Sequence, residues 1–216
     1  MPWQPGALQV SQERGVRRFA AADHQPGHPR LDSAGKVSFG WEVRIVSPNG
    51  SVLPPDTPGE LLIRGECLFS GYWRDPEATA AAFAEDGWYR TGDVARLTAD
   101  GYLYILDRAK DMIISGGENI YPAEVEAVLA RHPAVAEVAV VGRPDPTWGE
   151  AVHAVIIPVA GQADAVSADD IVSWCRDNLA HFKCPKSVEF AASLPRTTTG
   201  KVLKRELREQ LSQARS

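Results

Sequence analysis

The sequence has few cysteines and no long apolar run, and each absence excludes a class of protein. Three cysteines occur in 216 residues, and their spacing matches neither a disulfide framework nor a metal-binding motif; they are Cys67, Cys175 and Cys184. We therefore expect a reducing, cytoplasmic location and no metal site. No apolar stretch approaches the roughly 18 residues that a membrane-spanning helix requires, so no transmembrane segment is predicted.

The sequence also lacks an excess of basic charge. The formal net charge is −5, whereas a nucleic-acid partner normally requires a basic face. The first residues contain no long apolar core, so we do not expect a secretory signal. With 44% apolar and 24% charged residues, the composition is that of an ordinary globular protein of one or two domains.

Strand patterns dominate the first half of the chain. Alternating or apolar stretches predict strands at residues 42–46, 59–64, 94–97 and 102–106. The dipeptide Asp100-Gly101 between the last two stretches is typical of a β-hairpin turn. Asp75 and Pro76 are typical of the first positions of a helix. The first half is therefore predicted to be mainly β-structure.

Helices and strands alternate in the second half. A helix is predicted from Pro122, because the apolar residues after it share one helical face. Ser167 and Asp170 have the layout of a capping box at the start of another helix. The remaining predicted elements are strands at 138–141, 152–159 and 186–190 and a charged helix at 204–213. The fold class is thus α+β, with a small β-barrel-like subdomain followed by a mixed α/β domain.

Four charged residues within residues 107–111 separate the two halves. They cannot all be buried cheaply, so this segment is either an exposed connector or a hinge, in which a few residues absorb a large backbone change. We divide the chain into a poorly structured N-terminal segment (1–35), a β-rich subdomain (36–106), a hinge (107–111) and a C-terminal domain (112–216).

Two glycine-containing motifs have both a functional and a structural interpretation. In Tyr89-Arg-Thr-Gly-Asp93, the carboxylate of Asp93 could accept hydrogen bonds from a vicinal diol such as a ribose. Alternatively, this Asp satisfies backbone N–H groups of a turn. The paired glycines of Ser115-Gly116-Gly117 permit positive φ angles or close approach to a partner, or they form a loop between a strand and a helix.

The segment Pro195–Lys201 (PRTTTGK) is not a P-loop. Pro195 replaces the first glycine of that motif, and Val202 stands where a Ser or Thr would hold Mg²⁺. Lys201 could still place a cation at a developing negative charge, an effect of about 10² to 10³ in rate in a water-poor site. The alternative is a surface lysine before a charged helix.

In their order and spacing, these motifs resemble the C-terminal portion of the adenylate-forming, AMP-binding enzyme superfamily. The resemblance extends from about Ser33 to Leu207, and further matching segments are residues 59–65, 71–79 and 142–150. The run SGGENIYP, followed by a Glu-containing helix, is more similar to acyl-CoA synthetases than to peptide-synthetase domains.

The resemblance implies an enzyme that activates a carboxylic acid, such as a fatty acid, with Mg·ATP. The acyl group passes from its adenylate to CoA, and AMP and pyrophosphate are released. Asp93 is then expected to bind the ribose hydroxyls of ATP and AMP, and Arg108 to contact the nucleotide. Lys201 is expected to bridge the substrate carboxylate and the α-phosphate during adenylation.

The resemblance also implies moving parts. Lys110 is expected to be the hinge residue about which the C-terminal domain rotates between the two half-reactions. Ser115, Gly116 and Gly117 are expected to line the channel for the pantetheine arm of CoA, because side chains at the two glycines would obstruct it.

Parts of the family pattern are absent from the sequence. The Ser/Thr/Gly-rich phosphate loop and the Tyr-Gly-x-Thr-Glu segment do not occur, and the family's acyl pocket also lies in the portion without a counterpart. Mg²⁺ is expected for the full enzyme, but no ligand for it is identified in this chain. We expect an N-terminally truncated or frame-shifted ligase that does not turn over alone. The alternatives are one subunit of a two-chain ligase, whose partner supplies the ATP-binding half, and a non-catalytic interaction module.

Overall fold

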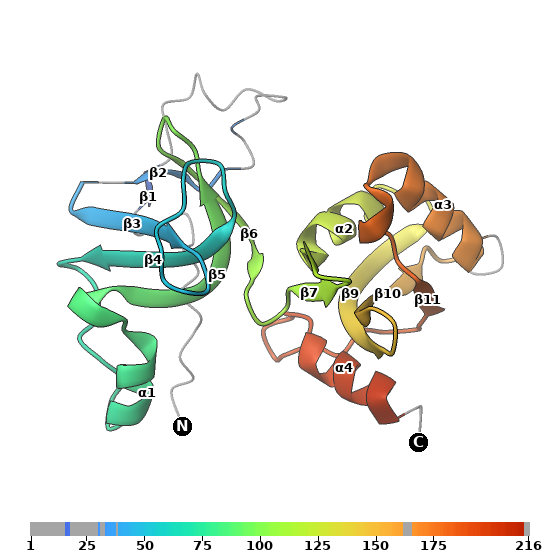
Figure 1. Cartoon of the computed structure of the whole chain (residues 1–216). Coiled ribbons are helices and arrows are strands. Elements are labelled where there is room, and N and C mark those ends of the chain that lie inside the picture. Colours follow the sequence, from blue (N-terminus) through green and yellow to red (C-terminus); the bar gives the residue numbers. More distant parts are fainter. Residues whose placement is uncertain (1–15, 18–29, 31–32, 38, 162–165, 214–216) are drawn as a thin grey trace. The chain divides into compact units, whose positions relative to one another are not determined.

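The chain divides into two compact units, Met1–Ala109 and Lys110–Ser216, here called the first and the second unit. The computed structural model describes residues 16–17, 30, 33–37, 39–161 and 166–213 (Figure 1). The N-terminal segment that we expected to be poorly structured therefore lies mostly outside the described residues. Within the described residues, no helix has the length and apolar character needed to cross a membrane.

The first unit is built on a six-stranded antiparallel sheet with the order β1-β2-β6-β5-β4-β3 (Figure 1). Its strands are β1 (Val16–Arg17), β2 (Gly35–Val37), β3 (Trp41–Val46), β4 (Gly59–Gly65), β5 (Tyr89–Leu97) and β6 (Tyr102–Arg108). The predicted strands and the β5–β6 hairpin are confirmed. Within the described part, β1 and β3 form the two edges and do not pair. The expected barrel is therefore an open sheet, because β1 and β2 are only two and three residues long.

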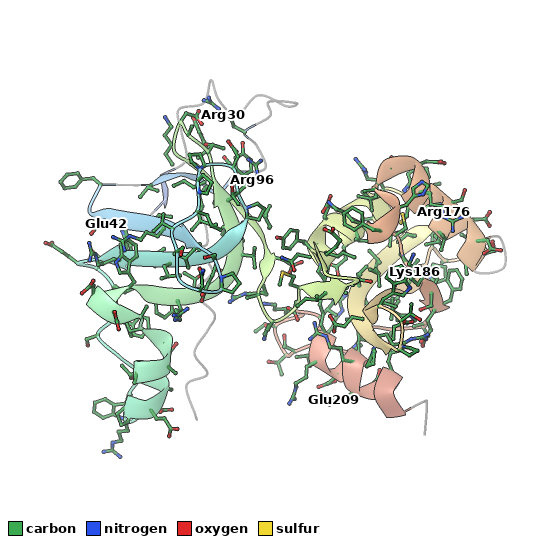
Figure 2. The ribbon with its side chains drawn as sticks, in the orientation of Figure 1. Arg30, Glu42, Arg96, Arg176, Lys186 and Glu209 are labelled. Atoms are coloured by element: carbon green, nitrogen blue, oxygen red, sulfur yellow. The ribbon has the colours of Figure 1, made fainter. Side chains whose placement is uncertain are left out.

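Alternation along the strands makes one face of this sheet apolar, whereas the other combines charged residues with a smaller buried cluster of Val46, Leu62 and Trp88. Ile45, Leu61 and Ile63 are buried in one core cluster, because residues two apart on a strand share a face. On the neighbouring positions, Arg64 pairs with Glu42 at 2.8 Å, and Figure 2 labels Glu42 on this sheet. Such exposed pairs add little stability, so the sheet is held mainly by its apolar face.

Helix α1 (Pro76–Ala82) begins at the predicted position. The side chain of Asp75 accepts a hydrogen bond from the backbone N–H of Ala78 at 2.9 Å, which satisfies one of the unpaired donors at a helix start. A short 3₁₀ turn, η2 (Glu85–Gly87), then leads into β5.

The second unit contains a five-stranded sheet in which β10 is the central strand. β10 pairs antiparallel with β9 along most of its length, parallel with β11, and through Gly149 with β7, which in turn pairs with β8. The strands are β7 (Ile113–Ser115), β8 (Glu118–Ile120), β9 (Val135–Asp145), β10 (Gly149–Pro158) and β11 (Ser187–Phe190). The mixed α/β character predicted for this half is confirmed.

The two faces of this sheet are covered by different helices. The even-numbered residues of β10, Val152, Ala154 and Ile156, share a core with α2 (Pro122–Leu129) and α3 (Ala168–Asn178). The odd-numbered Val155 shares a core with Leu207 of α4 (Lys204–Gln213). Successive side chains of a strand point to opposite faces, so α2 and α3 cover one face and α4 the other (Figure 1).

Helix α3 begins with the predicted capping box. The backbone N–H of Asp170 donates to Ser167 Oγ at 3.2 Å, and the backbone N–H of Ser167 donates to Asp170 Oδ2 at 2.9 Å. The box thus forms with Asp in place of the usual Glu. A 3₁₀ turn, η3 (His181–Lys183), connects α3 to β11.

Candidate functional site

The first unit brings Asp93 and Arg108 together across the β5–β6 pair. They are opposite each other in the strand register, and Arg108 Nε lies 3.0 Å from Asp93 Oδ1. The Asp93 side chain is only 7% exposed, whereas that of Arg108 is 25% exposed. The sequence predicted both residues as nucleotide contacts without predicting that they form an ion pair. The pair fixes the carboxylate in one orientation, because a charge-assisted bond is strong and directional.

The irregular stretch of β5 before Asp93 is fixed by Thr91. The Thr91 hydroxyl donates to the carbonyl of Leu61 at 2.9 Å and accepts from the backbone N–H of Asp93 at 3.1 Å. Gly92 has φ +72°, and a Cβ built there would lie 4.0 Å from the Arg108 guanidinium. The glycine is therefore required by its backbone conformation rather than by crowding.

Tyr89, the first residue of β5, is part of an aromatic cluster. Its ring centroid lies 5.1 Å from that of Phe69 and 5.6 Å from that of Phe83. Burial, together with a hydrogen bond to Tyr72, raises the pKa of Tyr89 to about 12. The phenol therefore stays protonated at neutral pH, in keeping with a structural role.

In the second unit, Gly116 and Gly117 form the two-residue turn of the β7–β8 hairpin. Ser115 pairs with Glu118, and the glycines have φ values of +60° and +87°. Two successive positive φ angles are typical of a type I′ turn, which joins hairpin strands. The alternative of a loop between a strand and a helix is wrong. A Gly-Gly pair between short apolar runs is itself a hairpin signal, and our sequence interpretation did not use it.

The two glycines differ in their surroundings. A Cβ on Gly116 would lie 2.8 Å from the ring of Trp148, whereas a Cβ on Gly117 would meet nothing within 4 Å. The Gly116 N–H also donates to the Trp148 carbonyl at 2.9 Å. Gly116 thus permits packing against the tryptophan, and Gly117 leaves open space above the turn.

Trp148 is a residue of the site that the sequence analysis did not single out. Its side chain is 48% exposed although it is large and apolar. Asp145 Oδ1 accepts from the Trp148 N–H at 3.0 Å and so holds the turn that presents it. The ammonium of Lys186, which is labelled in Figure 2, lies 5.7 Å from the ring centroid, within cation–π range. The sequence signal that could have identified this residue is a large aromatic side chain in an otherwise polar turn, Asp-Pro-Thr-Trp-Gly.

Lys201 lies at the end of a tightly bonded loop in the second unit. Arg196 and Val202 pair across the loop, and the Thr197 N–H donates to the Lys201 carbonyl at 2.8 Å. Arg196 Nη1 also donates to the Gly200 carbonyl at 2.6 Å. The backbone of the loop is therefore well fixed. The Lys201 side chain is exposed, and no ion pair to it is found among the described residues.

Lys110 is the first residue of the second unit, and its side chain is exposed. Asp93 and Arg108 belong to the first unit, whereas Lys110, the Ser115–Gly117 turn and Lys201 belong to the second. The described residues contain no group of three or more His, Cys, Asp or Glu side chains placed to hold a metal ion.

These features agree with the comparisons to known proteins. Residues 16–73 match the family described as AMP-binding enzyme, and residues 124–201 match the AMP-binding enzyme C-terminal domain. The chain therefore belongs to the AMP-binding enzyme family.

Its curated relatives include CoA ligases from bacteria. The chain is 49% identical to a feruloyl-CoA synthase from Amycolatopsis over 181 residues, which is 84% of this chain and 36% of the relative. It is 47% identical to the long-chain-fatty-acid–CoA ligase FadD13 of Mycobacterium tuberculosis, covering 85% of this chain and 35% of that protein. The chain thus spans about a third of the length of these relatives.

Solved structures show the same likeness. ATP-bound MatB from Rhodopseudomonas palustris is 38% identical with a TM-score of 0.76, over 83% of this chain and 35% of that chain. The o-succinylbenzoate CoA synthetase MenE of Bacillus subtilis, in complex with its acyl-adenylate intermediate, is 41% identical with a TM-score of 0.76, over 83% and 36%.

Proposed function

We propose that this chain acts as the C-terminal part of an AMP-forming acid–CoA ligase, which converts a carboxylic acid, ATP and CoA into acyl-CoA, AMP and pyrophosphate. The observation that carries the proposal is the Lys201 loop. It presents an exposed cation on a backbone held by its own hydrogen bonds, as expected of a group that binds an anionic partner. The named relatives, which are CoA ligases, support the same reaction.

In the first half-reaction, the first unit holds the nucleotide. Asp93 accepts hydrogen bonds from the ribose hydroxyls, and Arg108 keeps its carboxylate oriented while contacting the nucleotide itself. Because the pair is already formed at 3.0 Å, little reorganisation is required when the ribose binds.

Lys201 acts on the reacting groups. A carboxylate oxygen of the acid attacks the α-phosphorus of ATP, the bond to the pyrophosphate oxygen breaks, and pyrophosphate leaves. Both reactants are anionic, so an ammonium between them reduces their repulsion and stabilises the charge that develops in the transition state.

In the second half-reaction, the Gly116–Gly117 turn guides CoA. The CoA thiol gives up its proton and attacks the acyl carbonyl, and AMP leaves with the bonding electrons. The open space above Gly117 suits a thin pantetheine arm. The exposed ring of Trp148 offers a flat apolar surface beside the turn, and Lys186 a nearby cation for the phosphates of CoA.

Mg²⁺ accompanies ATP in this reaction, but the described residues provide no cluster of ligands for it. The chain spans about a third of its relatives, and the phosphate loop of the family is absent from its sequence. We infer that it requires a further ATP-binding portion, either in a longer polypeptide or in a partner chain.

The test compares the purified chain alone with the chain combined with a polypeptide that matches the remaining part of its relatives. The chain alone should show no carboxylate-dependent ATP–pyrophosphate exchange, and the combination should restore it. Exchange by the chain alone would show that no further portion is needed. Failure of every combination, with Gly117→Leu also no slower than Gly117→Ala in transfer from preformed acyl-adenylate to CoA, would favour a non-catalytic interaction module.

A further inference from the structure

The residues on either side of Lys110 are held by different units. The backbone N–H of Ala109 donates to the carbonyl of Gly92 at 2.9 Å, within the first unit. The carboxylate of Asp111 accepts a hydrogen bond from Arg208 Nη2 at 2.8 Å, within the second unit. Lys110 alone lies between these two anchors.

The Asp111–Arg208 bond is sheltered from water. The two side chains are 15% and 30% exposed, although the residues are 97 positions apart in sequence. By contrast, Arg205 and Glu209 on the same helix are 79% and 55% exposed and 3.7 Å apart; Figure 2 labels Glu209 on α4. A sheltered pair keeps more of its attraction than an exposed one, because water screens it less.

The partner of Asp111 is itself firmly placed. Helix α4 buries Leu207 against the sheet, and its first residue, Lys204, pairs with Glu126 of α2 at 2.7 Å. Glu126 Oε1 also accepts from the backbone N–H of Val140 at 2.7 Å. Asp111 is therefore tied to a helix that cannot move without disturbing the core of the second unit.

We propose that the Asp111–Arg208 ion pair is a positioning clamp that confines rotation between the two units to Lys110. Lys201 lies three residues before α4, so the same clamp keeps the lysine loop in a constant relation to the pivot. This role in positioning Lys201 rests on the proposed ligase function. The confinement of the joint to one residue does not depend on it.

Loss of the clamp lengthens the joint. The next regular element, β7, starts at Ile113, so without the ion pair Asp111 and Met112 join Lys110 as freely rotating residues. Each added rotatable residue multiplies the number of open conformations. We expect tryptic cleavage at the joint to rise by about tenfold, because cleavage requires local opening of the chain.

The experiment uses the full chain with variants that leave the sequence of the joint unchanged. Arg208→Met removes the cation, Arg208→Lys keeps a cation that can reach Asp111, and Arg205→Met is the matched control on the same helix. Hydrogen exchange and tryptic cleavage after Arg108 and Lys110 are measured alongside the unfolding midpoint of the second unit. Arg208→Met should accelerate cleavage at the joint by about tenfold, Arg208→Lys should restore much of the protection, and Arg205→Met should change nothing.

Three results would overturn the clamp: equal rates in all variants, equal acceleration by Arg205→Met, or faster exchange throughout the second unit rather than at the joint. A variant that fails to fold is replaced by Asp111→Asn, which preserves the shape of the side chain, with exchange compared after correction for the sequence change. No substrate enters these measurements. If Arg208→Met accelerates cleavage at the joint but Lys201→Ala leaves ATP–pyrophosphate exchange by the combined protein unchanged, the clamp is supported and the ligase function is refuted. If Lys201→Ala reduces that exchange but Arg208→Met has no effect at the joint, the ligase function is supported and the clamp is refuted.

Discussion

The two parts of the candidate site differ in how far their charges are already satisfied. In the first unit, Asp93 and Arg108 meet at 3.0 Å across the β5–β6 pair, and both side chains are largely buried. In the second unit, the Lys201 ammonium is exposed on a fixed loop. A buried pair fixes geometry, and removal of one partner is destabilising because it leaves the other charge buried and unpaired, whereas an unpaired surface cation adds little stability. The comparison indicates that the first unit contains a preformed ion pair, and that the second presents a cation whose contribution depends on an incoming anion.

The largest predicted effect is a loss of activity, without a loss of stability, when the Lys201 ammonium is removed. Lys201→Ala should reduce carboxylate-dependent ATP–pyrophosphate exchange by about 10² to 10³ in the chain combined with the remaining part of the ligase. The unfolding midpoint should stay unchanged, because the ammonium has no ion pair within the described residues. Arg205→Ala, which removes an exposed cation on α4, is the control and should leave exchange intact. A drop in the unfolding midpoint for Lys201→Ala would show that the lysine is structural.

Asp93→Asn should lower the stability of the first unit, in contrast to Lys201→Ala, which should leave stability unchanged. The change keeps the shape of the side chain but leaves the Arg108 guanidinium, which is three-quarters buried, with a weaker acceptor. We expect a loss of about 1–3 kcal/mol in the free energy of unfolding of the first unit, since hydrogen bonds to charged groups contribute on this scale. AMP binding should weaken in parallel, which calorimetric titration of the combined protein can measure.

A matched control exists in the same unit. Asp56 pairs with Arg96 at 2.7 Å, but its side chain is 58% exposed, and Arg96 is labelled in Figure 2. Asp56→Asn should therefore have little effect on unfolding or on AMP binding. If Asp56→Asn were as harmful as Asp93→Asn, burial would not be the cause of the difference.

Local signals in the sequence predict most of the fold. The capping residues Asp75 and Ser167 and the Asp100-Gly101 turn act through neighbouring backbone groups, so a short stretch of sequence is enough to predict them. The Asp93–Arg108 pair could not be predicted, because it depends on the register between two strands. The same holds for Trp148, whose place above Gly116 results from pairing between β10 and β7.

The Gly116–Gly117 turn tests whether the second unit also has a shaped surface for CoA. Gly117→Ala and Gly117→Leu introduce the same backbone strain, because both place a Cβ at φ +87°. They differ only in bulk above the turn. If the turn lines the channel, Gly117→Leu should slow transfer from acyl-adenylate to CoA by about tenfold relative to Gly117→Ala, since bulk in the path of the arm misplaces the thiol. Equal transfer rates for the two variants would attribute the whole effect to backbone strain and contradict a channel at Gly117.

The smallest expected effect is a difference between the two units in how far acidic pH lowers their unfolding midpoints. All histidines among the described residues lie in the second unit: His132, His153 and His181. His153 is buried in β10, with Nδ1 2.7 Å from Ser187 Oγ and Nε2 3.6 Å from Glu189 Oε2. Burial lowers the pKa of His153 below its ordinary value of 6.5, and nearby Arg143 acts in the same direction, although Glu189 opposes the shift.

The direction of the effect follows from this depressed pKa. The folded second unit prefers neutral His153, so the associated stability is complete above pH 6.5 and declines as the pH falls from 6.5 towards the folded-state pKa, because the unfolded chain takes up the proton first. The unfolding midpoint of the second unit should therefore fall between pH 7.5 and 5.5, whereas that of the first unit should change less. In His153→Gln, which does not titrate, the decline should be smaller. An equal decline in this variant would assign the pH response to other groups and would mean that His153 binds its proton equally well in the folded and the unfolded chain.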